Sequence, residues 1–201
     1  NLPVTVAVKG AEAVDKTALA AAIEKEDNSY KNESAFLSST WEAYKTALAA
    51  AKEVNAKEDA TQEEVNTALK NLNAAVSGLT YLSLNKVTVT PESLPSAGGT
   101  VTVKAEGILN AKVWWKLEKK SADGSYETEG ESVNEAVLSA DKTFTIELPA
   151  NAAETAAEYR IQVKESQPSA WMWGVTQKAT FTVAAKQVIP EEITSVTATA
   201  E

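Results

Sequence analysis

The sequence predicts two structural classes in one chain, an antiparallel three-helix bundle followed by an all-β sandwich. Two observations lead to this fold class, a multidomain protein of α and β type. Between residues 41 and 79 the apolar side chains recur every three or four positions, which is the period of an amphipathic helix. From residue 86 onward the apolar period becomes two, and turn residues interrupt it at intervals of roughly ten residues, which is typical of strands in a sandwich.

The composition is that of a globular and acidic chain. Its 201 residues allow one or two domains, and 44% of them are hydrophobic while 23% are charged. The net charge is -9 and Arg160 is the only arginine, so we expect no nucleic acid partner, because phosphate binding needs a basic surface. The chain has no cysteine and no histidine, which excludes a thiol nucleophile, a disulfide framework and histidine-based zinc sites or triads. We therefore expect no metal and no cofactor.

Neither end of the sequence resembles a targeting or membrane segment. No apolar run approaches the ~20 residues of a membrane-spanning helix, so we expect no membrane insertion. Residues 1–10 and 193–201 both alternate like strands. We interpret residues 1–10 as a strand-like tail of a preceding domain or a linker, and residues 186–201 as a linker and the start of a following domain. On this interpretation the chain is a segment of a longer protein.

The first two helices of residues 11–80 are marked by their ends. The first begins with Asp15 as its N-cap and ends at residues 27–29, and Ser38 or Ser39 caps the second. Their apolar faces are Leu19, Ala22 and Ile23 in the first helix, and Trp41, Tyr44, Leu48, Ala51 and Val54 or Asn55 in the second. Alanine-rich faces of this kind let helix axes approach closely.

The third helix begins with a capping box. The Thr61 hydroxyl can accept the amide proton of Glu64, while the Glu64 carboxylate accepts that of Thr61. The apolar face that follows is Val65, Ala68, Leu69, Leu72, Ala75, Val76 and Leu79. One helix with such a face is marginal alone, whereas three can share a small core, so we predict an up-down-up bundle.

This helical pattern resembles the FIVAR family, small three-helix bundles of Gram-positive surface proteins and secreted glycosidases. The matching features are Asp15, Leu19, Ile23, Trp41, AL at 47–48, AK at 51–52, and ATQEEV at 60–65, which is the most specific of them. The resemblance covers roughly residues 12–80. The family usually has Tyr-Thr-x-x-Ser-Trp before its second helix; here we expect Phe36 to fill the tyrosine position and Tyr30 to be extra. The resemblance implies a spacer or a partner of other modules, without catalytic residues.

Strands are predicted throughout residues 85–185. The segments are KVTVT, GTVTVKAE, KVWWKLEK, TFTIEL, EYRIQVKE and ATFTVA, separated by turns at Pro91, Pro95, Gly98–Gly99, Asp123–Gly124 and Pro149. Alternation predicts four inward-facing sets: Val101, Val103 and Ala105; Val113, Trp115 and Leu117; Phe144, Ile146 and Leu148; Tyr159, Ile161 and Val163.

Two aromatic positions in these strands resemble those of an immunoglobulin-like domain. Trp115 lies where such a domain has its core tryptophan, and Tyr159 lies where it has a tyrosine corner. The segment PESLPSAGGTVTV also resembles the opening of bacterial immunoglobulin-like repeats. We therefore expect residues 85–185 to form an immunoglobulin-like sandwich.

Carboxylate groups are the first candidates for catalysis. Two groups stand out: Glu24, Glu26 and Asp27, and Glu127, Glu129 and Glu131. A glycosidase needs two carboxyls that face each other across a cleft, whereas we expect these on solvated faces of small domains. The sequence therefore predicts that the chain is not an enzyme.

Metal binding and an internal crosslink are weaker interpretations. Asp123, Ser125 and Glu127 offer oxygens to calcium but lack the EF-hand spacing, and a β-hairpin turn at Asp123–Gly124 explains them better. An internal isopeptide crosslink, as in some Gram-positive surface domains, needs a lysine that points into the core. The three candidates are predicted to point outward: Lys104, Lys112 and Lys164.

The tryptophans are the main candidates for ligand binding. Trp114 shares a face with Lys112 and Lys116 opposite the core, and Trp171, Met172 and Trp173 precede the last strand. An indole is a large flat platform for a sugar ring or a protein partner. The alternative is that these rings pack against the helical domain or along a sheet edge, and we favour packing for at least one of Trp171 and Trp173.

The sequence thus predicts a non-catalytic, extracellular segment of a Gram-positive cell-surface or cell-wall protein, or of a secreted carbohydrate-active enzyme. It would space, present or dock the neighbouring domains of the same polypeptide, as a monomer. The second hypothesis is an adhesin module that binds host glycan or protein through exposed tryptophans. A third is an S-layer or filament subunit that associates edge to edge.

Overall fold

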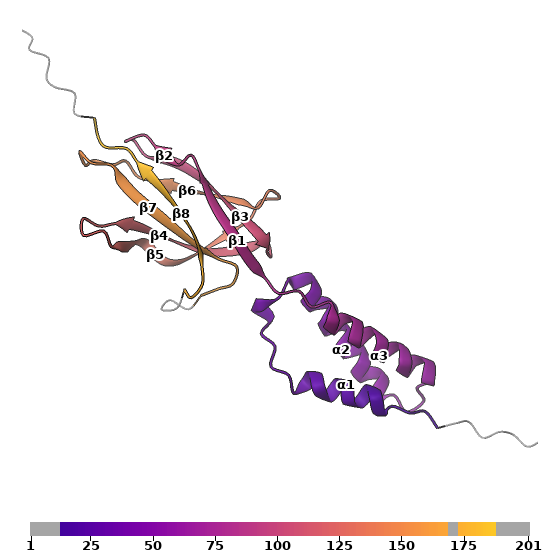
Figure 1. Ribbon diagram of the computed structural model, residues 1–201. Coiled ribbons are helices and arrows are strands. Elements are labelled where there is room, and N and C mark those ends of the chain that lie inside the picture. Colours follow the sequence, from indigo (N-terminus) through magenta and orange to yellow (C-terminus); the bar gives the residue numbers. More distant parts are fainter. Residues whose placement is uncertain (1–12, 169–172, 188–201) are drawn as a thin grey trace, which may run out of the picture. The chain divides into compact units, whose positions relative to one another are not determined.

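The computed structural model describes residues 13–168 and 173–187 (Figure 1). The strand-like interpretation of residues 1–10 and most of that of residues 186–201 fall outside the described residues. The chain divides into two compact units, Asn1–Tyr81 and Leu82–Glu201. We call their described parts the helical unit and the β unit, and each is considered by itself.

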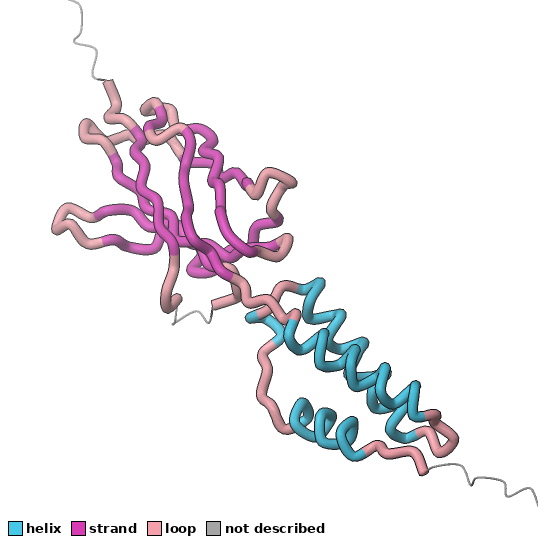
Figure 2. The backbone as a smooth tube through the Cα atoms, turned by 45° about the vertical axis from the view of Figure 1, so that its right-hand side comes forward, coloured by secondary structure: helices cyan, strands magenta, loops and turns pink. Residues whose placement is uncertain are grey.

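The helical unit contains three α-helices and one short 3-10 helix. These are α1 (Thr17–Asp27), η1 (Glu33–Ala35), α2 (Ser38–Ala56) and α3 (Gln62–Ser77) (Figure 2). The residues that close its core come from every α-helix and from the loop before α3: Leu19, Ile23, Ala51, Ala60, Val65, Ala68 and Leu72. Because Leu19, Ala51 and Leu72 are fully buried, the predicted apolar faces do meet in one core.

Two of the three predicted helix starts differ in detail. The capping box of α3 is confirmed, with Glu64 N–H donating to Thr61 Oγ1 and Thr61 N–H to the Glu64 carboxylate at 2.6 Å. Lys16, and not Asp15, occupies the N-cap of α1, although Asp15 Oδ1 still accepts from Thr17 N–H at 2.8 Å. The residue before α2 is Leu37, which has no capping side chain, so the serine cap was wrong.

Aromatic side chains form a second cluster in the helical unit. Phe36 stacks on Trp41 with ring centroids 5.5 Å apart, and Trp41 also contacts Tyr44. Phe36 is 4% exposed whereas Tyr30 is 96% exposed, in agreement with the assignment of Phe36 to the core position. The indole N–H of Trp41 is buried and has no hydrogen-bond partner.

The β unit consists of two sheets that share one core. The three-stranded sheet has the order β1-β3-β6 and the five-stranded sheet β2-β8-β7-β4-β5. The strands are β1 (Ser83–Thr90), β2 (Ser93–Leu94), β3 (Gly99–Ile108), β4 (Lys112–Lys120), β5 (Tyr126–Val137), β6 (Thr143–Leu148), β7 (Ala157–Lys164) and β8 (Gln177–Val183). All pairs are antiparallel except β2 with β8.

The predicted alternation holds in both sheets. The four sets predicted to face inward, on β3, β4, β6 and β7, all belong to the core or pack against it, with Trp115 only partly buried. The ring centroids of Trp115 and Phe144 lie 6.0 Å apart across the core, and those of the stacked pair Tyr159 and Phe181 lie 5.7 Å apart. The inward faces therefore follow from the period of two.

Two strands were not predicted. The short β2 has only two residues, and β5 is an edge strand of 12 residues that is exposed along most of its length. Its sequence, YETEGESVNEAV, is rich in glutamate and lacks a clear alternation of apolar and polar residues. In the structure its register with β4 also shifts between Trp115 and Leu117. Gly124, with φ 86°, makes the predicted turn between β4 and β5.

Candidate functional site

The candidate site lies on the side of the five-stranded sheet that points away from the core, which we call the outer face. On β4, Trp114, Lys116 and Glu118 alternate with the core residues and form one column of this face. The register places the flanking outward residues Lys164, Gln162 and Arg160 of β7 directly beside them, and Thr176, Lys178 and Thr180 on or just before β8 in the next column.

Trp114 lies on this face as predicted and is partly buried. Its strand neighbours are Lys164 on β7 and Glu135 on β5. Glu135 forms an ion pair with Lys112 at 2.7 Å, which confirms that these side chains share one side of the sheet. The indole of Trp114 is therefore set among charged groups.

Trp173 is packed onto the same sheet and is only 8% exposed. Its indole Nε1–H donates to the backbone carbonyl of Ser132 on β5 at 3.1 Å, and its own carbonyl accepts from Lys164 Nζ at 3.1 Å. Lys116 Nζ lies 5.5 Å from the ring centroid. Its contacts make Trp173 a packed ring within the β unit, which is the alternative we favoured for at least one ring, and it offers no open platform.

The other two residues of the predicted aromatic site, Trp171 and Met172, lie outside the described residues. The structure therefore brings together Trp114 and Trp173 on one face of β4 and β7. Lys164 links the two tryptophans, because it lies beside Trp114 in register and donates to the Trp173 carbonyl.

A buried carboxylate lies in the middle of the outer face. Glu118 is 4% exposed and binds Lys116 Nζ at 2.8 Å and Arg160 at 2.6 Å. Burial alone would raise the pKa of Glu118, but hydrogen bonds from Lys116, Gln162 and Arg160 outweigh it and lower the pKa below its ordinary value. Gln162, which is 6% exposed, also accepts a hydrogen bond from Thr176 Oγ1 at 3.1 Å.

The end of the face near the β4–β5 turn is also built from charged and aromatic groups. Glu158 accepts hydrogen bonds from the Tyr126 hydroxyl and, at 2.9 Å, from Lys120 Nζ, and these two bonds lower its pKa. The guanidinium of Arg160 lies 3.8 Å from the ring centroid of Tyr126. The outer face is thus held together by cross-strand polar contacts along its whole length.

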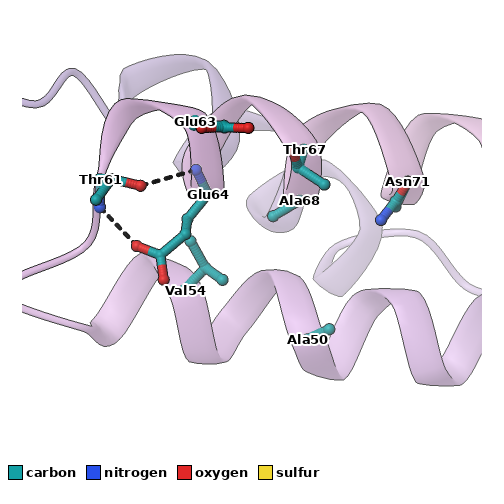
Figure 3. A pocket seen from close by; sticks show the side chains of 8 residues that line it. All are labelled: Ala50, Val54, Thr61, Glu63, Glu64, Thr67, Ala68 and Asn71. Carbon is teal, nitrogen blue, oxygen red and sulfur yellow. Dashed lines mark hydrogen bonds between the residues drawn. The ribbon is translucent and has the colours of Figure 1, made fainter.

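A separate groove lies between α2 and α3 in the helical unit (Figure 3). It encloses about 360 Å³ and is lined by Ala50, Val54, Thr61, Glu63, Glu64, Thr67, Ala68 and Asn71. The Glu64 carboxylate in it is bound by Lys57 and by the Thr61 amide, which lower its pKa to about 2. The Glu64 carboxylate in this groove is thus held by the capping box.

The two predicted carboxylate groups lie in different surroundings. Glu127, Glu129 and Glu131 are exposed, as predicted. The expectation that Glu26 lies on a solvated face was wrong: it is 6% exposed and binds Lys31 Nζ at 2.5 Å. Its neighbour Tyr44 has a pKa raised to about 12, mainly by burial and then by a hydrogen bond with Glu26. Glu26 is therefore part of a structural polar contact between the α1 end and α2.

The structure also shows the surroundings of the residues considered for metal binding and for an internal crosslink. Asp123 Oδ1 accepts from the backbone N–H and hydroxyl of Ser125, which makes it part of the hairpin turn. No group of three or more acidic side chains within residues 13–168 and 173–187 is arranged to hold a metal ion. Lys104 and Lys112 are exposed, and Lys164 donates to the Trp173 carbonyl, so all three predicted outward directions agree with the structure.

Sequence reasoning missed the polar part of the site. Alternation placed Lys116 outward, but it gave no reason to connect Glu118 with Arg160, which lies 42 residues away. It also gave no reason to connect Trp173 with Ser132, because β5 was not predicted. The pairing of β4 with both β5 and β7 brings these groups together.

Comparison with known proteins gives a family match within the helical unit. None of the described helices is long and apolar enough to cross a membrane. No curated protein matches the chain. The family model of the FIVAR domain, a domain found in cell-surface proteins and glycosidases, matches residues 15–80, and this confirms the resemblance drawn from the ATQEEV element and the tryptophan of α2.

Proposed function

We propose that this chain is a non-catalytic spacer and presentation segment of a larger extracellular protein. The observation that carries the proposal is the FIVAR match over residues 15–80, because FIVAR domains occur in extracellular and cell-surface proteins. The setting is a Gram-positive cell-surface or cell-wall protein, or a secreted carbohydrate-active enzyme. The partners are the neighbouring domains of the same polypeptide, and the chain is a monomer.

Two features of the architecture support this role. Each unit closes its own hydrophobic core, one of helices and one of sheets, so each has the basis for folding as a module. The short connection between α2 and α3, together with their packed faces, supports an antiparallel bundle. Self-contained modules of this kind are suited to setting the spacing between other domains.

We also infer that the β unit is immunoglobulin-like. Its strand order supports this: β1, β3 and β6 match the positions of strands A, B and E, and β4, β7 and β8 those of C, F and G. The partly buried Trp115 on β4 and the buried Tyr159 on β7 occupy the positions of the strand C tryptophan and the strand F tyrosine. On this basis β2 continues strand A on the second sheet, and β5 is the added edge strand C′.

The absence of catalysis is part of the proposal. Among the described residues, the acidic side chains that are buried, Glu26 and Glu118, are each engaged by cations. A general acid in a glycosidase instead needs a raised pKa and a partner across a cleft. The purified chain is expected to hydrolyse no chromogenic glycoside, ester or peptide. Saturable turnover that disappears on substitution of one carboxylate would overturn the proposal.

The spacer role itself is tested by limited proteolysis of the full chain. Cleavage between residues 78 and 86 should leave two fragments that each unfold cooperatively in calorimetry. Sedimentation should show a monomer, which separates this role from that of an S-layer or filament subunit. Fragments that lose all ordered structure, or a concentration-dependent filament, would contradict it.

A second candidate function is binding of a glycan or host protein. The partly exposed indole of Trp114, set among charged groups on the outer face, favours it. A glycan array probed with the full chain and with the Trp114→Ala variant tests this function. Binding that the substitution abolishes would assign the site.

A further inference from the structure

The outer face carries an excess of positive charge in a chain whose net charge is -9. The strand register places these cations on it: Lys112, Lys116 and Lys120 on β4, Arg160 and Lys164 on β7, and Lys178 on β8. The carboxylates of the same columns are Glu118, Glu135 and Glu158. Cations therefore outnumber carboxylates on this face, the reverse of the chain as a whole.

Ion pairing on the outer face leaves cations unneutralised. Glu118 is shared between Lys116 and Arg160, so one carboxylate faces two positive charges. Lys164 donates to a neutral backbone carbonyl, and the exposed Lys178 lies opposite the neutral Gln162. Within the described residues neither Lys164 nor Lys178 forms an ion pair. These two lysines are thus free to attract an anionic ligand.

The remaining glutamates of β5 do not cancel this excess, because even with Glu131, which lies in the register shift of that strand, the face has fewer carboxylates than cations. Glu127 and Glu129 pair with Lys119 and Leu117, whose positions alternate with the outer column, so they belong to the other side of β5. Glu165, beyond the end of β7, lines a pocket together with Lys164. The basic character is therefore concentrated on β4, β7 and β8.

We propose that the outer face binds an anionic polysaccharide, with carboxylate or sulfate groups on its sugars. Trp114 offers a partly exposed indole for a sugar ring, and Lys164 on the adjacent strand and Lys178 on β8, the two lysines of this face without an ion pair, are placed to meet the acidic groups. An acidic polypeptide would satisfy the lysines but would not need the flat indole. The proposal rests on the second candidate function, binding through Trp114, and is independent of the spacer role.

The test is binding of the full chain to heparin and to polygalacturonate, with dextran as a neutral polysaccharide and poly-glutamate as an acidic polypeptide. Isothermal titration calorimetry should show binding to the two acidic polysaccharides that weakens as salt is raised, because screening shortens the range of the attraction. Dextran and poly-glutamate should bind at least about tenfold more weakly, a difference of ~1.4 kcal/mol.

Three variants locate the site. Trp114→Ala and the double variant Lys164→Gln with Lys178→Gln should each weaken polyanion binding by about tenfold. The matched control is Lys86→Gln with Lys104→Gln, which removes the same charge from exposed positions on β1 and β3 of the other sheet and should leave binding unchanged. Circular dichroism confirms that each variant is folded.

Each other outcome overturns the proposal in a distinguishable way. Equal binding to dextran, lost in Trp114→Ala, would keep the glycan-binding function but exclude the anionic class. Equal binding to poly-glutamate without an effect of Trp114→Ala would make an acidic polypeptide the ligand. Equal loss in the control variant would mean that only net charge matters. Binding to none of the four polymers would remove both the proposal and the second candidate function, while the spacer role would stand.

Discussion

Each unit buries one glutamate among its described residues, and the two are held in different ways. Glu26 in the helical unit binds Lys31, five positions along the chain, and the hydroxyl of Tyr44. Glu118 in the β unit binds Lys116 on its own strand and Arg160 and Gln162 on the neighbouring strand. In the helical unit the cationic partner comes from the loop just after α1, whereas in the β unit Arg160 comes from the neighbouring strand.

The difference extends to what surrounds each carboxylate. Glu26 adjoins an aromatic cluster, because Tyr44 packs on Trp41, which packs on Phe36. Glu118 lies in a row of polar side chains on the outer face. One end of this row carries the tryptophans and the other end carries Tyr126. The helical site therefore depends on packing, and the sheet site depends on charge and hydrogen bonding.

The largest expected effect is at Trp41, and it tests the dependence on packing. Trp41→Ala should destabilise the helical unit by about 3–5 kcal/mol, because it removes a buried aromatic ring. Trp41→Phe should cost under about 1.5 kcal/mol, since the indole N–H has no partner to lose and an aromatic ring remains. Urea unfolding followed by far-ultraviolet circular dichroism measures both. Equal costs for the two variants would show that Trp41 contributes more than its volume.

The next effect compares the two buried carboxylates directly. Glu118→Gln should cost roughly 2 kcal/mol, because it leaves Lys116 and Arg160 without a carboxylate in a site of low exposure. Glu26→Gln should cost about 1 kcal/mol, since one cation with 19% exposure loses its partner. The measurement is the free energy of unfolding of each unit in urea. A larger cost at Glu26 would reverse the comparison.

The contribution of Glu118 should also depend on pH. Its pKa in the folded protein is lower than the ordinary value of 4.5, so its stabilisation is fully present above that value and is lost as pH falls through the folded pKa. The difference in unfolding free energy between the parent chain and Glu118→Gln should therefore shrink below about pH 4.5. A difference that stays constant from pH 7 to pH 3 would contradict this account.

The smallest effect is at the start of α3. Thr61→Ala removes the side-chain half of the capping box and should cost about 1 kcal/mol. Thr61→Ser keeps a hydroxyl acceptor and serves as the matched control, with a cost of no more than a few tenths of a kcal/mol expected. Equal unfolding midpoints for Thr61→Ala and the parent chain would show that water replaces the cap at no cost.

Local chemistry in the sequence was sufficient for much of the fold. The capping box of α3, the apolar faces of the helices and the inward residues of β3, β4, β6 and β7 were all predicted, because each depends on neighbours within a few positions. The same reasoning put Trp114 on the outer face. The failures at the α1 and α2 caps are shifts of one or two residues, the usual uncertainty of helix ends.

The position and register of β5, and the contacts between distant residues, were decided only by the tertiary structure. An acidic edge strand such as β5 carries little alternation, so neither its place beside β4 nor its shift in register follows from its letters. That pairing positions the Ser132 carbonyl to accept a hydrogen bond from the indole N–H of Trp173, and the pairing of β4 with β7 brings Arg160 to Glu118. The chain order determines which residues alternate, but the strand register determines which charges meet, because contacts across a sheet join residues that are far apart in sequence.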